Sequence, residues 1–264
     1  MHTCRPNEQI IEKILRECGA ILLDCLAEGR TEGNWIDTQF KATADDVAHN
    51  FLFSSLVNAF PGVPVISEED RNNNIFYERD HFIIDPIDGT ASFAQGFNGW
   101  VTQVAYISKG IPVMAGIYAP ASNEYFSASG KKGAYCNGYR LNLEKYNYKH
   151  LCLIDNYPQP KGLALELMKA LQINKYMESG SIALKICRIA DGSADLFIKD
   201  MTPMDWDLAA PMLVLAEAGG FLTDVNGVGI KLGSKDRRHQ GLIAAANPFL
   251  AQKVQRWVHS FKKT

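Results

Sequence analysis

The segment HFIIDPIDGTASFAQG, residues 81–96, places two carboxylates and a hydroxyl at the end of an apolar run. Asp85 and Asp88 lie three residues apart, and Thr90 follows two residues later. Two acids at such a junction are costly unless a positive species such as a divalent cation joins them, and the helix start that follows offers N–H groups that suit a phosphate. In a simpler interpretation, Asp85 occupies a turn and Asp88 caps a short helix that ends near Gly96. The segment alone leaves both interpretations open.

Acidic residues also follow a strand or begin a helix at two further places. Glu68 and Glu69 end a predicted strand in PGVPVISEED, residues 61–70, and Asp207 lies in the first turn of an apolar helix predicted from residue 205. Each could be a solvated acid or a favourable charge at a helix start. Because three such positions occur in one chain, the sequence predicts that these oxygen ligands converge on Mg²⁺.

Asp45 lies near the start of another predicted helix, in the segment Thr43-Ala44-Asp45-Asp46. Thr43 and Asp46 have the spacing of a helix-capping box, in which two side chains satisfy the first N–H groups of the helix. We expect these two residues to cap the helix, which leaves Asp45 free to face another segment.

Hydrophobic periodicity predicts the elements that must position these acids. Helical spacing occurs at residues 7–28, 43–60, 161–171, 181–191, 205–218 and from 247. Strands are predicted before Glu68, at HFIID, in a β-meander from Trp100 to Tyr135, and near residues 151–154, 195–198, 221–224 and 241–245. The inner face of the second helix is predicted to carry Val47, Ala48, Phe51, Ser55 and Ala59.

These elements predict a fold that mixes α+β with layered α/β structure. The periodicity is lost near residues 138–150, which predicts a boundary there. We therefore expect an N-terminal α+β subdomain, residues 1–140, with most of the acids, and a C-terminal α/β subdomain, residues 141–264, with Asp207.

Composition limits the function classes. With 264 residues, 47% of them apolar and 21% charged, the chain reads as a globular protein. A net charge of −2 does not indicate the basic surface that direct binding to nucleic acid or to an anionic membrane requires. We see neither a signal peptide nor a membrane span, so a cytoplasmic location is expected. The six cysteines lack metal-binding spacing, and Cys18 and Cys25 are expected in the core.

Three motifs together resemble a known family. Ser67-Glu68-Glu69, Asp85-Pro86-Ile87-Asp88-Gly89-Thr90 and Trp206-Asp207-Leu208-Ala209-Ala210 are similar, in order and separation, to the motifs of the inositol monophosphatase family of Mg²⁺-dependent phosphatases. The resemblance runs from about residue 8 to residue 250 and includes GKKGAYCNG (130–138) and LAEAGG (215–220). It implies a layered α/β/α/β/α sandwich, usually found as a homodimer.

The resemblance also implies roles for individual residues. One ion would be held by Glu68, Asp85 and the Ile87 carbonyl, and a second by Asp85, Asp88 and Asp207. Thr90 and Glu68 would position the attacking water, with Asp45 hydrogen-bonded to Thr90. The substrate contacts would be the N–H groups of Gly89 and Thr90 for the phosphate, Asp88 and Asp207 beside it, and Gly180, Ser181, Ile182 and Asp200 for the alcohol.

The implied reaction is Mg²⁺-dependent hydrolysis of a small phosphorylated polyol, of the inositol 1-phosphate type, by direct attack of a metal-activated water. Four clustered carboxylates, those of Glu68, Asp85, Asp88 and Asp207, would repel one another, and two or three Mg²⁺ ions would supply the compensating charge. Li⁺ could take the second ion's position, so lithium sensitivity is expected.

Two alternatives remain open. PGVPVISEED and GSIALKICRIADGSAD resemble the bacterial 3′(2′),5′-bisphosphate nucleotidase branch, which implies adenosine 3′,5′-bisphosphate as substrate. Asp200 and the pair Ala91-Ser92, where that branch commonly has Lys-Glu, favour a polyol instead. Because some bacterial relatives bind the transcription machinery, a non-catalytic regulatory binding protein of the same fold is the second alternative.

A haloacid-dehalogenase-like phosphatase is excluded by spacing. Those enzymes use Asp-x-Asp-Gly-Thr with the first aspartate as nucleophile. Here Asp85 and Asp88 are separated by two residues, and the motif lies deep in the chain.

Overall fold

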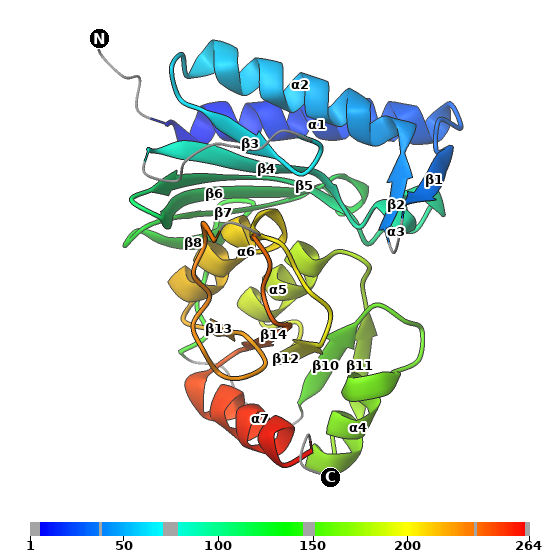
Figure 1. The fold of residues 1–264 in the computed structure, drawn as a ribbon, viewed down its shortest axis with the longest axis vertical. Coiled ribbons are helices and arrows are strands. Elements are labelled where there is room, and N and C mark those ends of the chain that lie inside the picture. Colours follow the sequence, from blue (N-terminus) through cyan, green and yellow to red (C-terminus); the bar gives the residue numbers. More distant parts are fainter. Residues whose placement is uncertain (1–5, 37–38, 71–78, 145–150, 235–236, 262–264) are drawn as a thin grey trace.

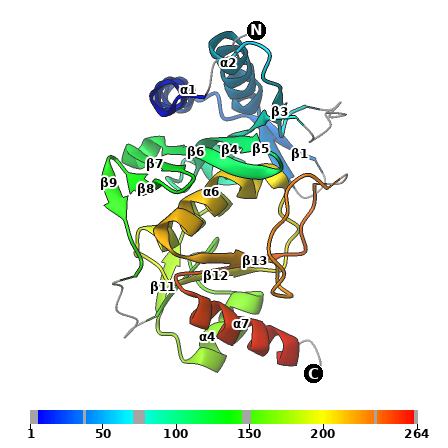
Figure 2. The ribbon, with the colours of Figure 1, turned by 90° about the vertical axis from the view of Figure 1, so that its left-hand side faces the viewer.

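The computed structural model describes residues 6–36, 39–70, 79–144, 151–234 and 237–261. Its helices and sheets are layered in the order α/β/α/β/α, as Figures 1 and 2 show. Helices α1 (Glu8–Ala27) and α2 (Thr43–Ala59) cover one face of a seven-stranded sheet. Helices α5 (Ile182–Ala190) and α6 (Asp205–Ala218) separate it from a five-stranded sheet, whose far face is covered by α4 (Gly162–Leu171) and α7 (Pro248–Phe261). The expected layered fold is confirmed.

The predicted helices form within a residue or two of their expected bounds, and a short helix α3 (Thr90–Ala94) follows the acidic segment. Asn7 caps α1 by accepting hydrogen bonds from the N–H groups of Gln9 and Ile10. None of the helices in the described residues combines the length and apolarity that crossing a bilayer requires.

The predicted inner face of α2 is confirmed in part, since Ala48 is buried and Val47, Phe51 and Ala59 pack against the core while partly exposed. Its buried apolar residues are Ala44, Ala48, Leu52 and Leu56. Phe51, Ser55 and Ala59 are only partly buried. The buried face also includes the carboxylate of Asp45, which sequence periodicity treats as polar and therefore exposed.

The seven-stranded sheet carries the predicted meander. Its order is β3 (Val65–Ser67), β4 (His81–Asp88), β5 (Val101–Ser108), β6 (Ile111–Ala119), β7 (Glu124–Ser129), β8 (Gly133–Cys136) and β9 (Tyr139–Leu141). Strands β3 and β4 are parallel, and the remaining pairs are antiparallel.

The five-stranded sheet has the order β11 (Lys175–Glu178), β10 (Cys152–Asp155), β12 (Leu196–Lys199), β14 (Leu242–Ala245) and β13 (Phe221–Thr223). A separate hairpin joins β1 (Gly33–Ile36) and β2 (Gln39–Ala42). Strands β1, β2, β9 and β11 were not predicted, because short strands with polar residues give weak periodic signals.

The sequence predicts that the strand ends at Asp85, but strand β4 continues to Asp88. Its pairing with β5 shifts between these two residues, since Asp85 lies opposite Gln103 and Asp88 lies opposite Val101. Pro86 has no N–H to donate to the ladder, so a bulge forms there. The bulge brings both acids to the same place at the end of the strand.

The middle layer joins the two halves of the chain. One apolar cluster includes Ile66 and Phe126 from the first half and Val214 from the second. Across the same layers, Nη1 of Arg188 on α5 lies 2.8 Å from Oε1 of Glu124 on β7. The division into residues 1–140 and 141–264 stays a prediction, and residues 145–150 of the expected boundary lie outside the described residues.

The expected burial of Cys18 and Cys25 is confirmed, since both lie on the core-facing side of α1. The thiols of the described cysteines are free.

Candidate metal centre

Three of the predicted acids converge where the layers meet. Asp85 and Asp88, at the end of β4, and Asp207, in the first turn of α6, each offer an oxygen within 4.8 Å of the others. Asp85 and Asp88 are buried, and Asp207 is partly buried. Segments more than a hundred residues apart in the sequence therefore form one cluster of negative charge.

Asp85 carries the strongest sign that something else belongs in this cluster. Its Oδ2 accepts a hydrogen bond from Nε2 of Gln103 at 3.4 Å, but its buried Oδ1 has no partner. Burial, followed by the charge of Glu68, raises the pKa of Asp85 well above its ordinary value. An unpartnered buried carboxylate oxygen is costly, and a hard cation such as Mg²⁺ would satisfy it. The donor set therefore fits a divalent cation.

Asp88 is held by the start of α5. Its Oδ2 accepts hydrogen bonds from the Ser181 hydroxyl and the Ala183 N–H, both at 2.6 Å, and its Oδ1 accepts from the Ile182 N–H at 3.1 Å. Burial raises the pKa of Asp88, and these donors oppose the rise. The helix start at residues 180–182 thus lies at the cluster, where it binds an aspartate. Its predicted contact with substrate stays a prediction.

Asp207 is fixed by its own helix. Its Oδ2 accepts a hydrogen bond from the Met204 N–H at 2.6 Å. Burial, followed by the charge of Asp88, raises the pKa of Asp207 to about 7. Nearby, Asp205 lies 2.8 Å from Nε2 of His239, which anchors the first turn of α6.

The predicted capping box at the start of α2 is wrong. The N-cap is Ala42, and Asp45 accepts its N–H at 2.7 Å. Thr43 already lies inside the helix, where its hydroxyl donates to the Glu32 carbonyl, and Asp46 is exposed. The box fails because its first side chain must stand at the N-cap itself.

Asp45 nevertheless reaches Thr90, as expected. Its Oδ1 lies 3.4 Å from the Thr90 hydroxyl, which also lies 2.9 Å from the Ile87 carbonyl. Gly89, between the two, adopts a left-handed conformation with φ of 95° that suits glycine. The structure thus brings Asp45, Ile87 and Thr90 together beside the acid cluster.

Glu68 and Asp200 lie outside the three-acid group. The Glu68 N–H donates to the Ile84 carbonyl at 3.3 Å, so its backbone runs beside β4. Its charge is the largest single charge that raises the pKa of Asp85, which places it next to the cluster. Asp200 is exposed at the end of β12, and its role stays a prediction.

Two polar residues at the site were missed in the sequence. Lys185 on α5 is fully buried, with Nζ 2.7 Å from Oδ1 of Asn156 and 2.9 Å from the Gly180 carbonyl. Burial lowers its pKa to about 7, against the charge of Asp88. A lone lysine in the apolar stretch GSIALKICRIA, and Gln103 in an apolar strand, were the available signals.

Backbone segments pack without space for side chains where α5 meets the loop after α3. The Ser181 N–H donates to the Gly99 carbonyl at 2.7 Å. A Cβ added at Gly180 would lie 1.8 Å from the Ser92 hydroxyl and 2.8 Å from the Gly99 carbonyl. The glycine at position 180 therefore allows α5 to approach Asp88.

We expect Gly180→Ala to lower the free energy of unfolding by about 2–3 kcal/mol, because the added methyl must displace packed backbone. Urea denaturation measures the change. Gly229→Ala is the control, since a Cβ there meets nothing within 4 Å, and its effect should stay within about 0.5 kcal/mol. Equal effects at the two positions would contradict the packing argument.

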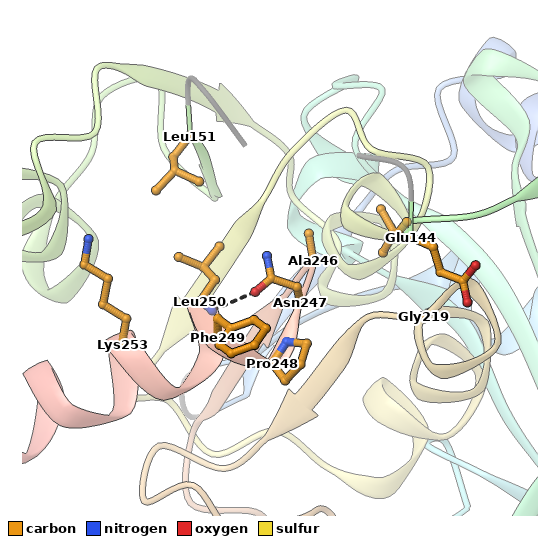
Figure 3. A pocket seen from close by; sticks show the side chains of 10 residues that line it. Glu144, Leu151, Gly219, Ala246, Asn247, Pro248, Phe249, Leu250 and Lys253 are labelled. Atoms are coloured by element: carbon orange, nitrogen blue, oxygen red, sulfur yellow. Dashed lines mark hydrogen bonds between the residues drawn. The ribbon is translucent and has the colours of Figure 1, made fainter. Parts of the chain in front are cut away.

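A hollow of about 550 Å³ lies elsewhere, at the start of α7 (Figure 3). Its lining includes Leu143, Gly219, Phe249 and Lys253. Gly219 follows the last residue of α6, whereas Asp207 stands in the first turn, so about 18 Å of helix separates the hollow from the acids. None of the predicted site residues lines this hollow.

A layered α/β fold with a buried, cation-fitting acid cluster between its layers defines a candidate metal-binding protein. The family model described as "Inositol monophosphatase family" matches residues 9–261, so the chain belongs to that family of metal-dependent phosphatases.

The chain is similar to several known proteins. It is 30% identical to a putative Nus factor SuhB of Neisseria meningitidis, over 92% of this chain and 94% of that protein. It is also 30% identical to a fructose-1,6-bisphosphatase/inositol-1-monophosphatase of Thermotoga maritima, over 81% and 83%. The crystal structure of extragenic suppressor protein suhB from Bartonella henselae matches with a TM-score of 0.79, at 25% identity, over 95% and 97%.

Proposed function

We propose that this protein is a Mg²⁺-dependent phosphomonoesterase that hydrolyses a small phosphorylated polyol of the inositol 1-phosphate type by direct attack of water. The observation that carries the proposal is the buried, unpartnered Oδ1 of Asp85 within a group of three acids. Glu68, Asp85 and the Ile87 carbonyl would hold one ion, and Asp85, Asp88 and Asp207 a second. Bound Mg²⁺ would lower the pKa of water and neutralise charge on the phosphate.

The remaining site residues would bind and orient. The Thr90 hydroxyl, held by Asp45, would orient the water, and Glu68 would accept its proton. The N–H groups of Gly89 and Thr90 would donate to the phosphate at the start of α3. Ser181 would keep Asp88 in place. No covalent intermediate is needed, so Thr90 is not the nucleophile.

The test is phosphate release from inositol 1-phosphate, adenosine 3′,5′-bisphosphate, fructose 1,6-bisphosphate and histidinol phosphate, each with and without Mg²⁺. We expect Mg²⁺-dependent turnover with the highest kcat/KM for inositol 1-phosphate. Turnover that is equal without Mg²⁺, or absent for the whole panel, would contradict the proposal.

Li⁺ is expected to inhibit the Mg²⁺-supported reaction at millimolar concentration. A small monovalent cation could enter the second ion position among Asp85, Asp88 and Asp207 but would neutralise less phosphate charge there. Titration of LiCl at fixed Mg²⁺, with NaCl as the control for ionic strength, measures the effect. Activity that is unchanged by Li⁺ would remove this expectation.

A bisphosphate nucleotidase is the second candidate. Nζ of Lys161 and Nζ of Lys199 lie 4.7 and 5.1 Å from the centre of the Tyr157 ring, in the segment that also contacts the start of α5. These ammonium groups could receive a second phosphate. However, Lys199 already pairs with Asp155 at 2.7 Å, so part of that positive charge is offset. The polyol is therefore the first candidate, and adenosine 3′,5′-bisphosphate in the panel decides.

A regulatory binding role is the third candidate, and the similarity to a putative Nus factor favours it. Such a protein would bind its partner without turnover. The acid cluster favours catalysis, because three converging carboxylates with the charge of Glu68 beside them are costly to keep without a cation.

A further inference from the structure

Helix α2 contacts two segments of the site from positions one turn apart. Asp45 and His49 are four residues apart, so their side chains share one side of the helix. Asp45 lies 3.4 Å from the Thr90 hydroxyl, and Nδ1 of His49 lies 2.8 Å from the Ser67 hydroxyl. Ser67 immediately precedes Glu68. One helix therefore contacts both segments to which we assign the orientation of water.

The Ser67 hydroxyl organises the turn that contains Glu68. It is fully buried and accepts the Glu69 N–H at 3.3 Å. The Ser67 N–H lies 3.3 Å from Oδ2 of Asp70, and Nε2 of His49 lies 3.8 Å from Oδ1 of the same residue. With its proton on Nε2, toward Asp70, His49 accepts at Nδ1 from the Ser67 hydroxyl. The turn is thereby tied to α2.

This turn decides where the Glu68 carboxylate lies. Strand β3 ends at Ser67, and the backbone of Glu68 stays beside β4 through the bond from its N–H to the Ile84 carbonyl. The turn at Ser67–Glu69 therefore sets where the Glu68 side chain leaves the edge of the sheet. Its charge still has the largest effect of any neighbouring charge on the pKa of Asp85. A small shift of the turn would change the separation of the two carboxylates, which an ion shared between them would sense.

We propose that His49 is a positioning residue that holds the Ser67–Glu69 turn, and thereby Glu68, as Asp45 holds Thr90. The inference rests on the proposed function, because that function assigns Glu68 to the ion and the water. His49 touches neither. A purely structural role is the competing interpretation, since the His49 ring also packs 5.7 Å from the Phe53 ring.

Two variants of His49 separate these interpretations. His49→Asn places an amide near the position of Nδ1 and can keep the bond to Ser67, whereas His49→Leu fills the space without it. For His49→Leu we expect Mg²⁺ binding, measured by titration calorimetry, to weaken about tenfold, and kcat to fall about 10–100-fold with KM within about twofold. His49→Asn should keep both quantities within about threefold. His259→Leu, an exposed histidine on α7, is the control.

Ser67→Ala gives an independent route to the same answer if His49→Leu does not fold. It should reproduce the weaker Mg²⁺ binding, because it removes the hydroxyl through which His49 acts. The double variant of Ser67→Ala and His49→Leu should bind Mg²⁺ no more weakly than the more impaired of the two single variants. Both substitutions remove the same hydrogen bond, so their effects should not add.

Several results would overturn the inference. One such result is that His49→Leu leaves the Mg²⁺ affinity and kcat unchanged, whatever it does to thermal stability. Another is that His49→Asn lowers the Mg²⁺ affinity and kcat as much as His49→Leu does. A third is that the losses of Mg²⁺ affinity in the two single variants add in the double variant. If the wild-type protein takes up no Mg²⁺, the proposed function fails and the inference fails with it. If it binds Mg²⁺ without hydrolysing any phosphate ester, calorimetry alone decides for His49.

Discussion

Asp88→Asn is expected to lower kcat/KM for phosphate release by on the order of 1000-fold or more. Asp88 contributes one of the oxygens within 4.8 Å of Asp85 and Asp207, and its amide analogue brings no charge to a cation. A loss of several kcal/mol of transition-state stabilisation is sufficient for this fall in kcat/KM, because each 1.4 kcal/mol changes the rate about tenfold. Steady-state kinetics at saturating Mg²⁺, with circular dichroism to check folding, measures the effect.

The control for this variant is Asp46→Asn. Asp46 is an exposed acid at the start of α2, and we expect its replacement to change kcat/KM less than twofold. If Asp88→Asn kept more than a tenth of the wild-type activity, Asp88 would not hold a catalytic ion. A regulatory protein of this fold would instead keep its partner when Asp88 is replaced, and this outcome separates catalysis from binding.

The sequence was sufficient to predict three of the acids that converge, although Glu68, predicted with them, lies beside the group, and it could not predict how each is held. Asp85, Asp88 and Asp207 stand in motifs whose residue types already indicate oxygen ligands, and the structure gathers them. That Asp88 binds the start of α5, some ninety residues away, depends on packing between layers. No local pattern at Asp88 carries that information.

Local rules failed where tertiary contacts overrode them. At the start of α2 it is Asp45, and not Thr43 or Asp46, that accepts the N–H of the N-cap Ala42, and the same carboxylate also faces Thr90. The buried face of α2 therefore includes Asp45, which hydrophobic periodicity assigns to solvent. Buried polar residues such as Lys185 were missed for a similar reason, since periodicity assigns a charged side chain to solvent.

Without Mg²⁺, the stability of the folded protein is expected to fall as pH rises from about 4 to 7. This is the reverse of acid denaturation, in which stability falls as pH is lowered. In the metal-free protein the pKa of Asp207 is raised to about 7, and that of Asp85 is raised well above its ordinary value, in both cases first by burial. The folded state therefore binds more protons than the unfolded state between about pH 4 and pH 7. Stability is greatest at the acid end of this window and is lost as pH rises through the raised pKa values.

We expect the metal-free Tm to fall by on the order of 10 °C between pH 5 and pH 7, given about 1.4 kcal/mol per pKa unit and about 2–4 °C per kcal/mol. Asp207→Asn should flatten this profile, and Asp46→Asn should leave its slope unchanged. Differential scanning calorimetry in EDTA measures both. If the metal-free Tm of Asp207→Asn fell with pH as steeply as that of the wild type, the pH dependence could not be assigned to the acid cluster.

Other buried groups act on the same profile, so the comparison with Mg²⁺ is the sharper measurement. Burial lowers the pKa of His81, which makes stability rise with pH below its ordinary pKa, and burial lowers the pKa of Lys185 to about 7, which does the same above pH 7. The His81 effect does not involve the acid cluster, and the Lys185 effect lies above the range from pH 5 to pH 7. Because Mg²⁺ competes with protons for the carboxylates, the gain in Tm from saturating Mg²⁺ should grow steadily from pH 5 to pH 7. A gain that stays constant across that range would mean that the cation binds elsewhere than at Asp85, Asp88 and Asp207.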